Sequence, residues 1–404
     1  MKKNYSLTLF RSALVLVIGC AFLLPGSARA QTQTVVMTGL HNPRGIAFAP
    51  DGALYVAESG CGGNTSDCAI PPNPSDPSAP CVVLPGGTVV CLGLTGSISR
   101  LSDGIQERVA TEFPSLSAAA QGGGNAIGPT DISPVQTGTV YQLYTTIGLQ
   151  GDPAFRTLAD IGPLFAQLAH IPPSTIFPYA QGPGIFTADW LIADIGNYEA
   201  QQNPDGGPFD TNPYGLLSLT GAWIVADAGG NSLLRVDGSG EISTLAVFPS
   251  RAQGRRFNGV LIDAVPTSVA VGPDGAYYVG ELTGSPFFNG AANIYRVIPN
   301  GVPIVDPEVY LSGFKSVIDI AFDANGNLYV LQFATGATGL PANSGVLKRV
   351  ELNGCTTAPN DCPRTDVVSG LNRPTSFAIA PDGSIYVTNN GTSPTAGEVL
   401  RIEP

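Results

Sequence analysis

Histidine is nearly missing from this chain of 404 residues, which contains only His41 and His170. Neither is accompanied by the Gly-x-Ser-x-Gly turn that presents a nucleophilic serine, so nothing in the sequence indicates a Ser-His-Asp triad. Charged residues are also few, at 12% of the chain. Little acid-base machinery is therefore concentrated anywhere along the sequence.

Clusters of lysine and arginine are missing as well. The net charge is −12, and loss of the first 30 residues, with four cations and no anions, would make it −16. Phosphate contacts need grouped Lys and Arg side chains, so a nucleic-acid partner is excluded.

Only one stretch is long and apolar. Lys2, Lys3 and Arg11 precede an apolar run, and small residues follow up to Ala30. This order is typical of a signal peptide over residues 1–30, cleaved after Ala30, and predicts a periplasmic or secreted protein. An alternative is a lipoprotein anchored through Cys20. No later stretch is long and apolar enough to be a transmembrane segment.

The rest of the chain contains a sequence repeat. GIAFAPDGALYVAES (45–59), SVAVGPDGAYYVGEL (268–282), DIAFDANGNLYVLQF (319–333) and SFAIAPDGSIYVTNN (376–390) each join two alternating apolar runs through a tight-turn sequence. Alternation around Asp-Gly or Asn-Gly predicts a β-hairpin. Two degenerate copies lie at 129–145 and 213–229, which makes six.

The six copies predict an all-β, six-bladed β-propeller of the NHL or gluconolactonase-like type. Their first strands begin at Pro43, Pro129, Pro213, Pro266, Val317 and Pro374. The last copy has only three strands, and TQTVVMTGL (32–40) can supply the fourth. The ring would then close by pairing the two ends of the chain, leaving few unprotected edges. We therefore predict one domain over residues 31–404.

Two insertions interrupt the repeat, at about 59–96 and 146–212. The second includes residues 152–171, where Asp152 as N-cap and Pro153 at the first helical position predict a short helix. Leu158, Ile161, Phe165 and Leu168 would form its apolar stripe, and Gly162-Pro163 would break or kink it.

Six of the seven cysteines follow the signal segment. They form three neighbouring pairs, and in an exported chain sequential pairing is the simplest of fifteen connectivities. A zinc site is the alternative. The predicted disulfides join Cys61 to Cys68, Cys81 to Cys91, and Cys355 to Cys362.

Polar residues recur at the last position of the second strand in each copy: Glu58, Tyr144, Asp227, Glu281, Gln332 and Asn389. A second ring at the start of the first strands includes Asp131 and Asp319. Carboxylates gathered at one channel mouth raise one another's pKa or bind a cation, and oxygen ligands suit Ca²⁺. We therefore predict a calcium or polar-ligand site from Glu58, Asp227 and Glu281, helped by Asp131 or Asp319, with Tyr144, Gln332 and Asn389 completing the polar ring. The alternative is that these residues only make hydrogen bonds to neighbouring blades.

Long segments of the mature chain resemble the ScyD/ScyE family, NHL-type propeller proteins associated with cyanobacterial gene clusters for scytonemin. The resemblance is carried by residues 198–217, 225–251, 265–287 and 387–402. It implies a six-bladed propeller in an exported location, with no established reaction.

The function predicted from these features is a binding or scaffold module for a small molecule, glycan or protein partner. Aromatic residues in the loop-rich regions within or next to these segments are candidates for a contact surface: Trp190, Tyr198, Phe209, Phe287 and Phe288. The alternative is a divalent-metal-dependent lactone or ester hydrolase. Gluconolactonase-type enzymes place a metal-binding Glu at the start of the first inner strand, where this chain has Asn42-Pro43-Arg44-Gly45. A soluble quinoprotein glucose dehydrogenase would need a His base, and neither histidine ends a second strand.

Overall fold

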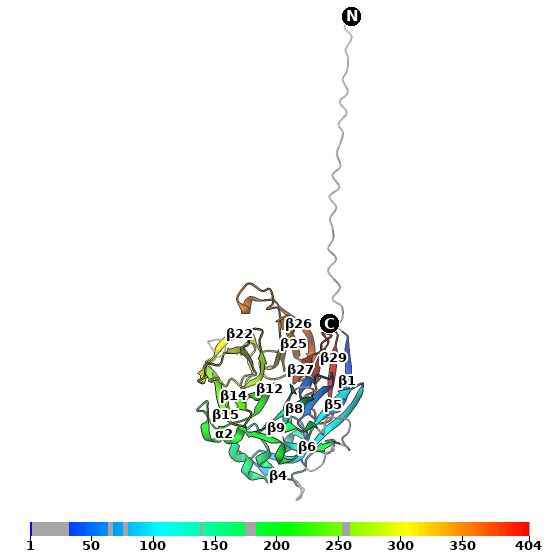
Figure 1. The fold of residues 1–404 in the computed structure, drawn as a ribbon, viewed down its shortest axis with the longest axis vertical. Coiled ribbons are helices and arrows are strands. Elements are labelled where there is room, and N and C mark those ends of the chain that lie inside the picture. The colour runs from blue at the N-terminus through cyan, green and yellow to red at the C-terminus, as the bar shows by residue number, and fades with distance from the viewer. Residues whose placement is uncertain are drawn as a thin grey trace. The chain divides into compact units, whose positions relative to one another are not determined.

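Six antiparallel sheets form a ring in the computed structural model (Figure 1). The structure describes Met1 and residues 32–63, 68–75, 80–137, 140–173, 183–252 and 259–403. Apart from Met1, the predicted signal peptide and Cys20 lie outside these residues. No helix in the described ranges is long and apolar enough to cross a membrane.

Each sheet, or blade, begins with an inner strand, and each inner strand contacts those of the two neighbouring blades. The inner strands are β2 (Pro43–Phe48), β7 (Pro129–Thr137), β12 (Pro213–Leu219), β18 (Pro266–Val271), β23 (Val317–Phe322) and β27 (Ser376–Ile379). The second strands are β3 (Leu54–Glu58), β8 (Val140–Ile147), β13 (Ala222–Asp227), β19 (Tyr277–Glu281), β24 (Leu328–Gln332) and β28 (Ile385–Asn389). The predicted hairpins and the six-bladed propeller are confirmed.

The third strands are β5 (Val89–Ser102), β9 (Gln167–Ile171), β14 (Ser232–Asp237), β20 (Ala292–Val297), β25 (Gly345–Val350) and β29 (Gly397–Ile402). The outer strands are β6 (Ile105–Ala118), β11 (Leu191–Asp194), β15 (Ile242–Val247), β22 (Glu308–Phe314), β26 (Arg364–Leu371) and β1 (Gln33–Leu40). Additional strands are β4 (Cys81–Val83) beside β5, β10 (Gly184–Ile185) parallel to β6, β21 (Ile304–Val305) parallel to β15, and the separate pair β16 (Arg251–Ala252) and β17 (Leu261–Ile262).

The N-terminal strand completes the last blade, as predicted. β1 pairs antiparallel with β29, which places the blue strand beside the red one in Figure 1. Met37 and Leu40 of β1 are buried with Val399 of β29, so ring closure also buries apolar surface.

The Asp-Gly turns explain why the hairpins form where the repeat predicts them. In the first copy the Asp51 carboxylate accepts the backbone N–H of Ala53, and Gly52 has a φ of 86°. The same Asp-to-backbone bond occurs at Asp274 and Asp382. The left-handed residue of such a turn is favourable for glycine, which has no Cβ to clash.

Hydroxyl groups join neighbouring blades near the axis. In three blades the threonine after the first residue of the copy donates to the first carbonyl of the next blade: Thr130 to Pro213 (2.8 Å), Thr267 to Val317 (2.8 Å) and Thr375 to Pro43 (2.7 Å). Apolar clusters fill the space between the sheets further out.

The insertion in blade 2 differs from the prediction. Asp152 does accept the Ala154 N–H, but the segment forms two short 3₁₀ helices, η2 (Pro153–Leu158) and η3 (Gly162–Leu164). The predicted apolar stripe is wrong, because Leu158 is exposed and Leu168 lies in β9, the third strand of blade 2. Pairing with β8 overrides the local helical pattern. The described residues also form α2 (Ile195–Gln202), η1 (Ala119–Gln121), η4 (Ala188–Trp190) and η6 (Pro359–Asp361).

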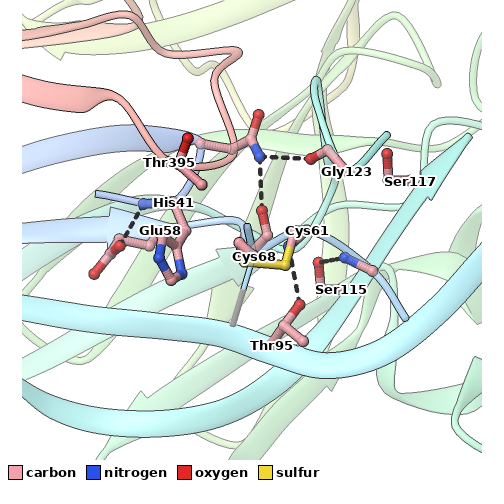
Figure 2. Close-up of a disulfide and its surroundings, with 12 residues drawn as sticks. His41, Glu58, Cys61, Cys68, Thr95, Ser115, Ser117, Gly123 and Thr395 are labelled. Atoms are coloured by element: carbon pink, nitrogen blue, oxygen red, sulfur yellow. Dashed lines mark hydrogen bonds between the residues drawn. A yellow bond between two sulfur atoms is a disulfide. The ribbon is translucent and has the colours of Figure 1, made fainter. Parts of the chain in front are cut away.

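All three predicted disulfides are present: Cys61–Cys68, Cys81–Cys91 and Cys355–Cys362. Around the first, Cys61 donates its backbone N–H to Thr95 Oγ1, and the next residue, Gly62, donates to Ser115 Oγ (Figure 2). The disulfide therefore closes the loop after β3, and these two hydrogen bonds attach that loop to the long hairpin of β5 and β6.

Candidate functional site

The residues predicted at the ends of the second strands have a structural role in four blades. Each side-chain oxygen accepts a backbone N–H from the residue one or two positions ahead of the first residue of its copy. The bonds run to Glu58 from His41 (2.6 Å), to Asp227 from Asn212 (2.6 Å), to Gln332 from Lys315 (2.9 Å) and to Asn389 from Asn372 (2.8 Å). Figure 2 shows the first of these bonds. These side chains hold the approach to each inner strand in place.

Glu58 is fully buried and already has a cationic partner. It forms an ion pair with Arg108 of β6 at 2.8 Å and accepts hydrogen bonds from Ser97 and Ser99 of β5. Burial favours the neutral acid, but the Arg108 hydrogen bonds and charge outweigh it and hold the pKa of Glu58 below its usual value. Arg108 thus already supplies a positive charge to this carboxylate.

Glu281 is also fully buried beside an arginine. It pairs with Arg251 of β16 and accepts the Asn293 N–H at 2.8 Å. Burial raises the pKa of Glu281 to about 7, and Arg251 offsets only part of that effect. The two glutamates therefore belong to separate ion pairs with different arginines.

Tyr144 does not hold the position predicted for it. β8 continues to Ile147, which pairs with Pro129 as Glu58 pairs with Pro43 in blade 1. Tyr144 instead pairs across β8 and β9 with His170 and packs against Trp223. Blade 2 therefore places an apolar residue where four other blades place their capping oxygen.

Asp131 and Asp319 lie in the inner strands of blades 2 and 5 and link neighbouring blades. Asp131 accepts the N–H of Leu216 at 2.7 Å, and Asp319 accepts the Ser376 hydroxyl at 2.6 Å and the Phe377 N–H at 3.0 Å. Burial, and then the charge of Asp319, raise the pKa of Asp131, while burial raises the pKa of Asp319 to about 6. A Cβ at Gly45 would come within 2.2 Å of Asp131 Oδ1, so glycine there makes room for this carboxylate.

Four of the carboxylates in the predicted calcium or polar-ligand site already have partners within the protein. Glu58 and Glu281 pair with arginines, and Asp131 and Asp319 accept hydrogen bonds from backbone N–H groups and a hydroxyl. Among the residues that the structure describes, no group of three or more His, Cys, Asp or Glu side chains could hold a metal ion.

A cavity of about 390 Å³ lies at the mouth of the ring, where the inner strands begin, and five blades or their connecting loops contribute to it. Its walls include the residue that follows the first position of five of the six copies: Arg44, Thr130, Tyr214, Thr267 and Ile318. Phe287, Phe333 and Leu340 add an apolar wall. This ring lies one position before the ring that includes Asp131 and Asp319, and the sequence analysis did not single it out. Three copies have threonine at this position, whereas the others have Arg44, Tyr214 and Ile318. This difference between copies could have identified the ring from the sequence.

Two residues of the cavity wall, Asp210 and Thr283, each have a side-chain oxygen without a hydrogen-bond partner. These atoms, Asp210 Oδ1 and Thr283 Oγ1, are buried. Thr283 is 1% exposed and has a φ of 73°, an unfavourable backbone conformation for a β-branched residue. Unpaired buried polar groups and strained backbone conformations often occur at functional sites.

Arg44 and Tyr214 also line the cavity and carry polar side chains. Arg44 donates to the Ala126 carbonyl at 2.7 Å. Burial raises the pKa of Tyr214, and the nearby Arg44 charge partly lowers it again. Arg44 is the only Lys or Arg among the described residues that line the cavity.

Acidic side chains raise one another's pKa around Asp210 of the cavity wall. Burial raises the pKa of Glu199 to about 8 and that of Asp210 to about 6, and in both cases Asp227 is the next largest cause. A Cβ at Gly230 would meet Glu199 Oε2 at 3.0 Å and Asp227 Oδ2 at 3.1 Å, so glycine provides the space between the two carboxylates.

The aromatic residues proposed as a contact surface do not form one patch. Trp190 is buried against Phe113 and Phe186, while Phe209 is exposed and Phe287 lines the mouth cavity. A larger groove, of about 850 Å³, lies between the blade 1 loop and the blade 2 insertion. None of the unpaired buried polar atoms of the described residues lines that groove. The mouth cavity is therefore the candidate site.

No protein-family model and no curated protein matches the chain. A glucose dehydrogenase crystal structure aligns with a TM-score of 0.52 at 13% identity over 92% of this chain and 99% of that one. An aldose sugar dehydrogenase from Streptomyces coelicolor, in its PQQ-bound form, gives 0.49 at 13% over 92% and 98%. A catalytically inactive virginiamycin B lyase from Staphylococcus aureus gives 0.43 at 11% over 93% and 99%. At these identities the first likeness supports the propeller fold and no activity, and the other two carry no argument.

Proposed function

We propose that this chain is an exported propeller that binds a small molecule in the mouth cavity. The observation that carries the proposal is a cavity with walls from five blades, in which Asp210 Oδ1 and Thr283 Oγ1 are buried without partners. A volume of about 390 Å³ lies within the range of small-molecule sites. Because the inner strands are fixed by bonds between blades, the cavity is preformed.

Export is part of the proposal. Three disulfides in the described residues are compatible with an oxidising compartment. The periplasmic or secreted location also rests on the signal-like sequence of residues 1–30. Membership of the ScyD/ScyE family is proposed on the segments quoted above and is consistent with this location.

The hydrolase alternative has less support. A metal-dependent hydrolase needs ligands at the mouth, yet this chain has Asn42-Pro43-Arg44-Gly45 where gluconolactonase-type enzymes have a metal-binding Glu. Calcium binding stays a prediction, and carboxylates without a cationic partner, such as Asp227 and Asp210, are more suitable for it than Glu58 or Glu281. A calcium titration followed by melting temperature tests it, because a bound ion stabilises the folded state.

Blocking the cavity tests the proposed function. Leu340→Trp narrows the mouth, whereas Leu261→Trp enlarges an exposed side chain on β17 and serves as the matched control. Each protein is screened against a library of sugars, organic acids and other small metabolites by thermal shift. We expect compounds that stabilise the parent protein and the Leu261→Trp variant to lose most of their effect on Leu340→Trp. Equal stabilisation of both variants would contradict a site at the mouth.

A further inference from the structure

The position of Arg44 departs from a pattern that the fold itself establishes. The equivalent residues Thr130, Thr267 and Thr375 each use a hydroxyl to join their blade to the next. In blade 1 this link is made by Ser59, whose hydroxyl donates to the Pro129 carbonyl at 2.8 Å. Arg44 is therefore not needed for the contact that its position usually provides.

Arg44 is a buried cation without a carboxylate partner. Its residue is 7% exposed, and none of the ion pairs among the described residues includes it. It donates to the Ala126 carbonyl at 2.7 Å and, over a longer 3.4 Å, to Ser59 Oγ, and its charge and hydrogen bond partly offset the raised pKa of the Tyr214 phenol. A guanidinium held away from water is costly unless an anion or several acceptors compensate it. Planar two-pronged donors also suit carboxylate and phosphate groups.

A ligand in the cavity should also carry hydrogen-bonding groups. Asp210 Oδ1 can only accept a hydrogen bond when ionised, and Thr283 Oγ1 can donate or accept. Both atoms are buried and unpaired, and each such group costs about 1–3 kcal/mol until a partner arrives. Ligand hydroxyls can satisfy both of them, whereas a purely apolar ligand would satisfy neither.

We propose that the mouth cavity binds a small hydroxylated anion, with its charged group against Arg44 and its hydroxyls toward Asp210 and Thr283. This inference rests on the proposed function and specifies its ligand class. A cationic ligand would be repelled by the Arg44 guanidinium, and a neutral ligand would leave that guanidinium without an anionic partner. The apolar wall of Phe287 and Phe333 provides a surface for the carbon skeleton.

Calorimetric titration with matched sugars tests the charge requirement. The probes are D-glucuronate, D-gluconate and glucose 6-phosphate as anions, with D-glucose as the neutral counterpart. We expect at least one anion to bind with a Kd below about 1 mM, at least tenfold tighter than glucose, a difference of about 1.4 kcal/mol. Binding should weaken as salt is raised, because the anion and Arg44 attract one another. Comparison of the carboxylates with the phosphate identifies which anionic group fits.

The key variant is Arg44→Thr, which restores the residue found in three other blades and is expected to fold. It should lower the affinity for the anion at least tenfold while leaving the melting temperature within a few degrees. Arg235→Thr removes an exposed arginine of β14 and is the control. Asp210→Asn should also weaken binding, with Arg44 still present.

Three results would overturn the inference. They are equal anion binding by the parent and Arg44→Thr proteins, no binding of any anionic probe at 10 mM, and glucose binding as tight as that of the anions. If glucose binds and Leu340→Trp abolishes that binding, the small-molecule function stands and only the anionic class is wrong. If Leu340→Trp leaves all binding unchanged, the proposed function itself fails.

Discussion

At the residue scale, the buried carboxylates of this propeller differ in what compensates them. Glu58 has Arg108, and its pKa is lowered, while Glu199 has no cation and its pKa is raised to about 8. Two glutamates that look alike in the sequence therefore make opposite contributions to the pH dependence of stability.

Glu199→Gln should stabilise the protein at alkaline pH. A raised folded-state pKa means that the folded protein holds the proton of Glu199 more tightly than the unfolded chain does. The stabilising contribution of this proton is therefore fully present below pH 4.5 and is lost as the pH rises toward 8. Because glutamine stays neutral, we expect the variant to gain on the order of 2 kcal/mol at pH 9 and little at pH 4.

Chemical denaturation at both pH values measures this effect. Glu241→Gln, which removes an exposed glutamate, is the control and should change stability by less than about 0.5 kcal/mol. A Glu199→Gln variant that is equally affected at both pH values would show that Glu199 does not titrate as described.

The Glu58–Arg108 pair should behave as a unit. Arg108→Met leaves a buried carboxylate without its cation, so we expect a loss of about 3 kcal/mol. The double variant Glu58→Gln, Arg108→Met should recover part of this loss. A double-mutant cycle by denaturant unfolding gives the coupling energy, and additive effects would mean that the ion pair is not what stabilises Glu58.

At the scale of elements, the inserted loops are attached to the blades by disulfides without replacing the blade strands. Cys81–Cys91 joins β4 to β5, and Cys61–Cys68 closes the loop after β3 on itself. The second predicted insertion, at about 146–212, includes β9 and β11, which are the third and outer strands of blade 2.

Removing the Cys81–Cys91 disulfide should increase the mobility of its loop and leave the ring folded. For Cys81→Ala, Cys91→Ala, the chain-entropy relation for a loop of 10 residues gives a loss of about 2–3 kcal/mol if unfolding is cooperative. Hydrogen exchange should increase in β4 and in the paired part of β5, while exchange in blades 3 to 5 stays unchanged. Increased exchange throughout the ring would instead assign this disulfide a role in the whole fold.

At the scale of the whole molecule, the ring depends on one strand from the other end of the chain. β1 is the outer strand of the last blade, and its Met37 and Leu40 are almost completely buried. Without it, β29 would present an unpaired edge, which favours aggregation.

Deleting residues 32–40 should therefore be far more damaging than deleting an equal length of loop. We expect loss of the cooperative melting transition, measured by calorimetry, together with aggregation. A circular permutant that places residues 32–40 directly after residue 403 should restore folding, because it supplies the same strand. Failure of this permutant would indicate that chain connectivity, and not strand pairing alone, matters for closure.

Local sequence information was sufficient for the hairpins, the number of blades, the closing strand and the three disulfides. These features depend on residues that are close together in the sequence or on the alternation of apolar and polar residues in strands. Both kinds of pattern can be recognised in the sequence. Tyr144 shows the limit of that approach, since a strand three residues longer than expected moved the capping position to Ile147.

The candidate site was decided by the tertiary structure. Arg108 reaches Glu58 from the outer strand, and Arg251 reaches Glu281 from outside the four-stranded blade, so no spacing rule relates either arginine to its glutamate. Likewise, Arg44, Asp210 and Thr283 come from different blades or loops and line one cavity only because the ring closes. Sequence periodicity determined which residues point toward the axis, while the contacts between blades determined which of them are neutralised and which are left to bind a ligand.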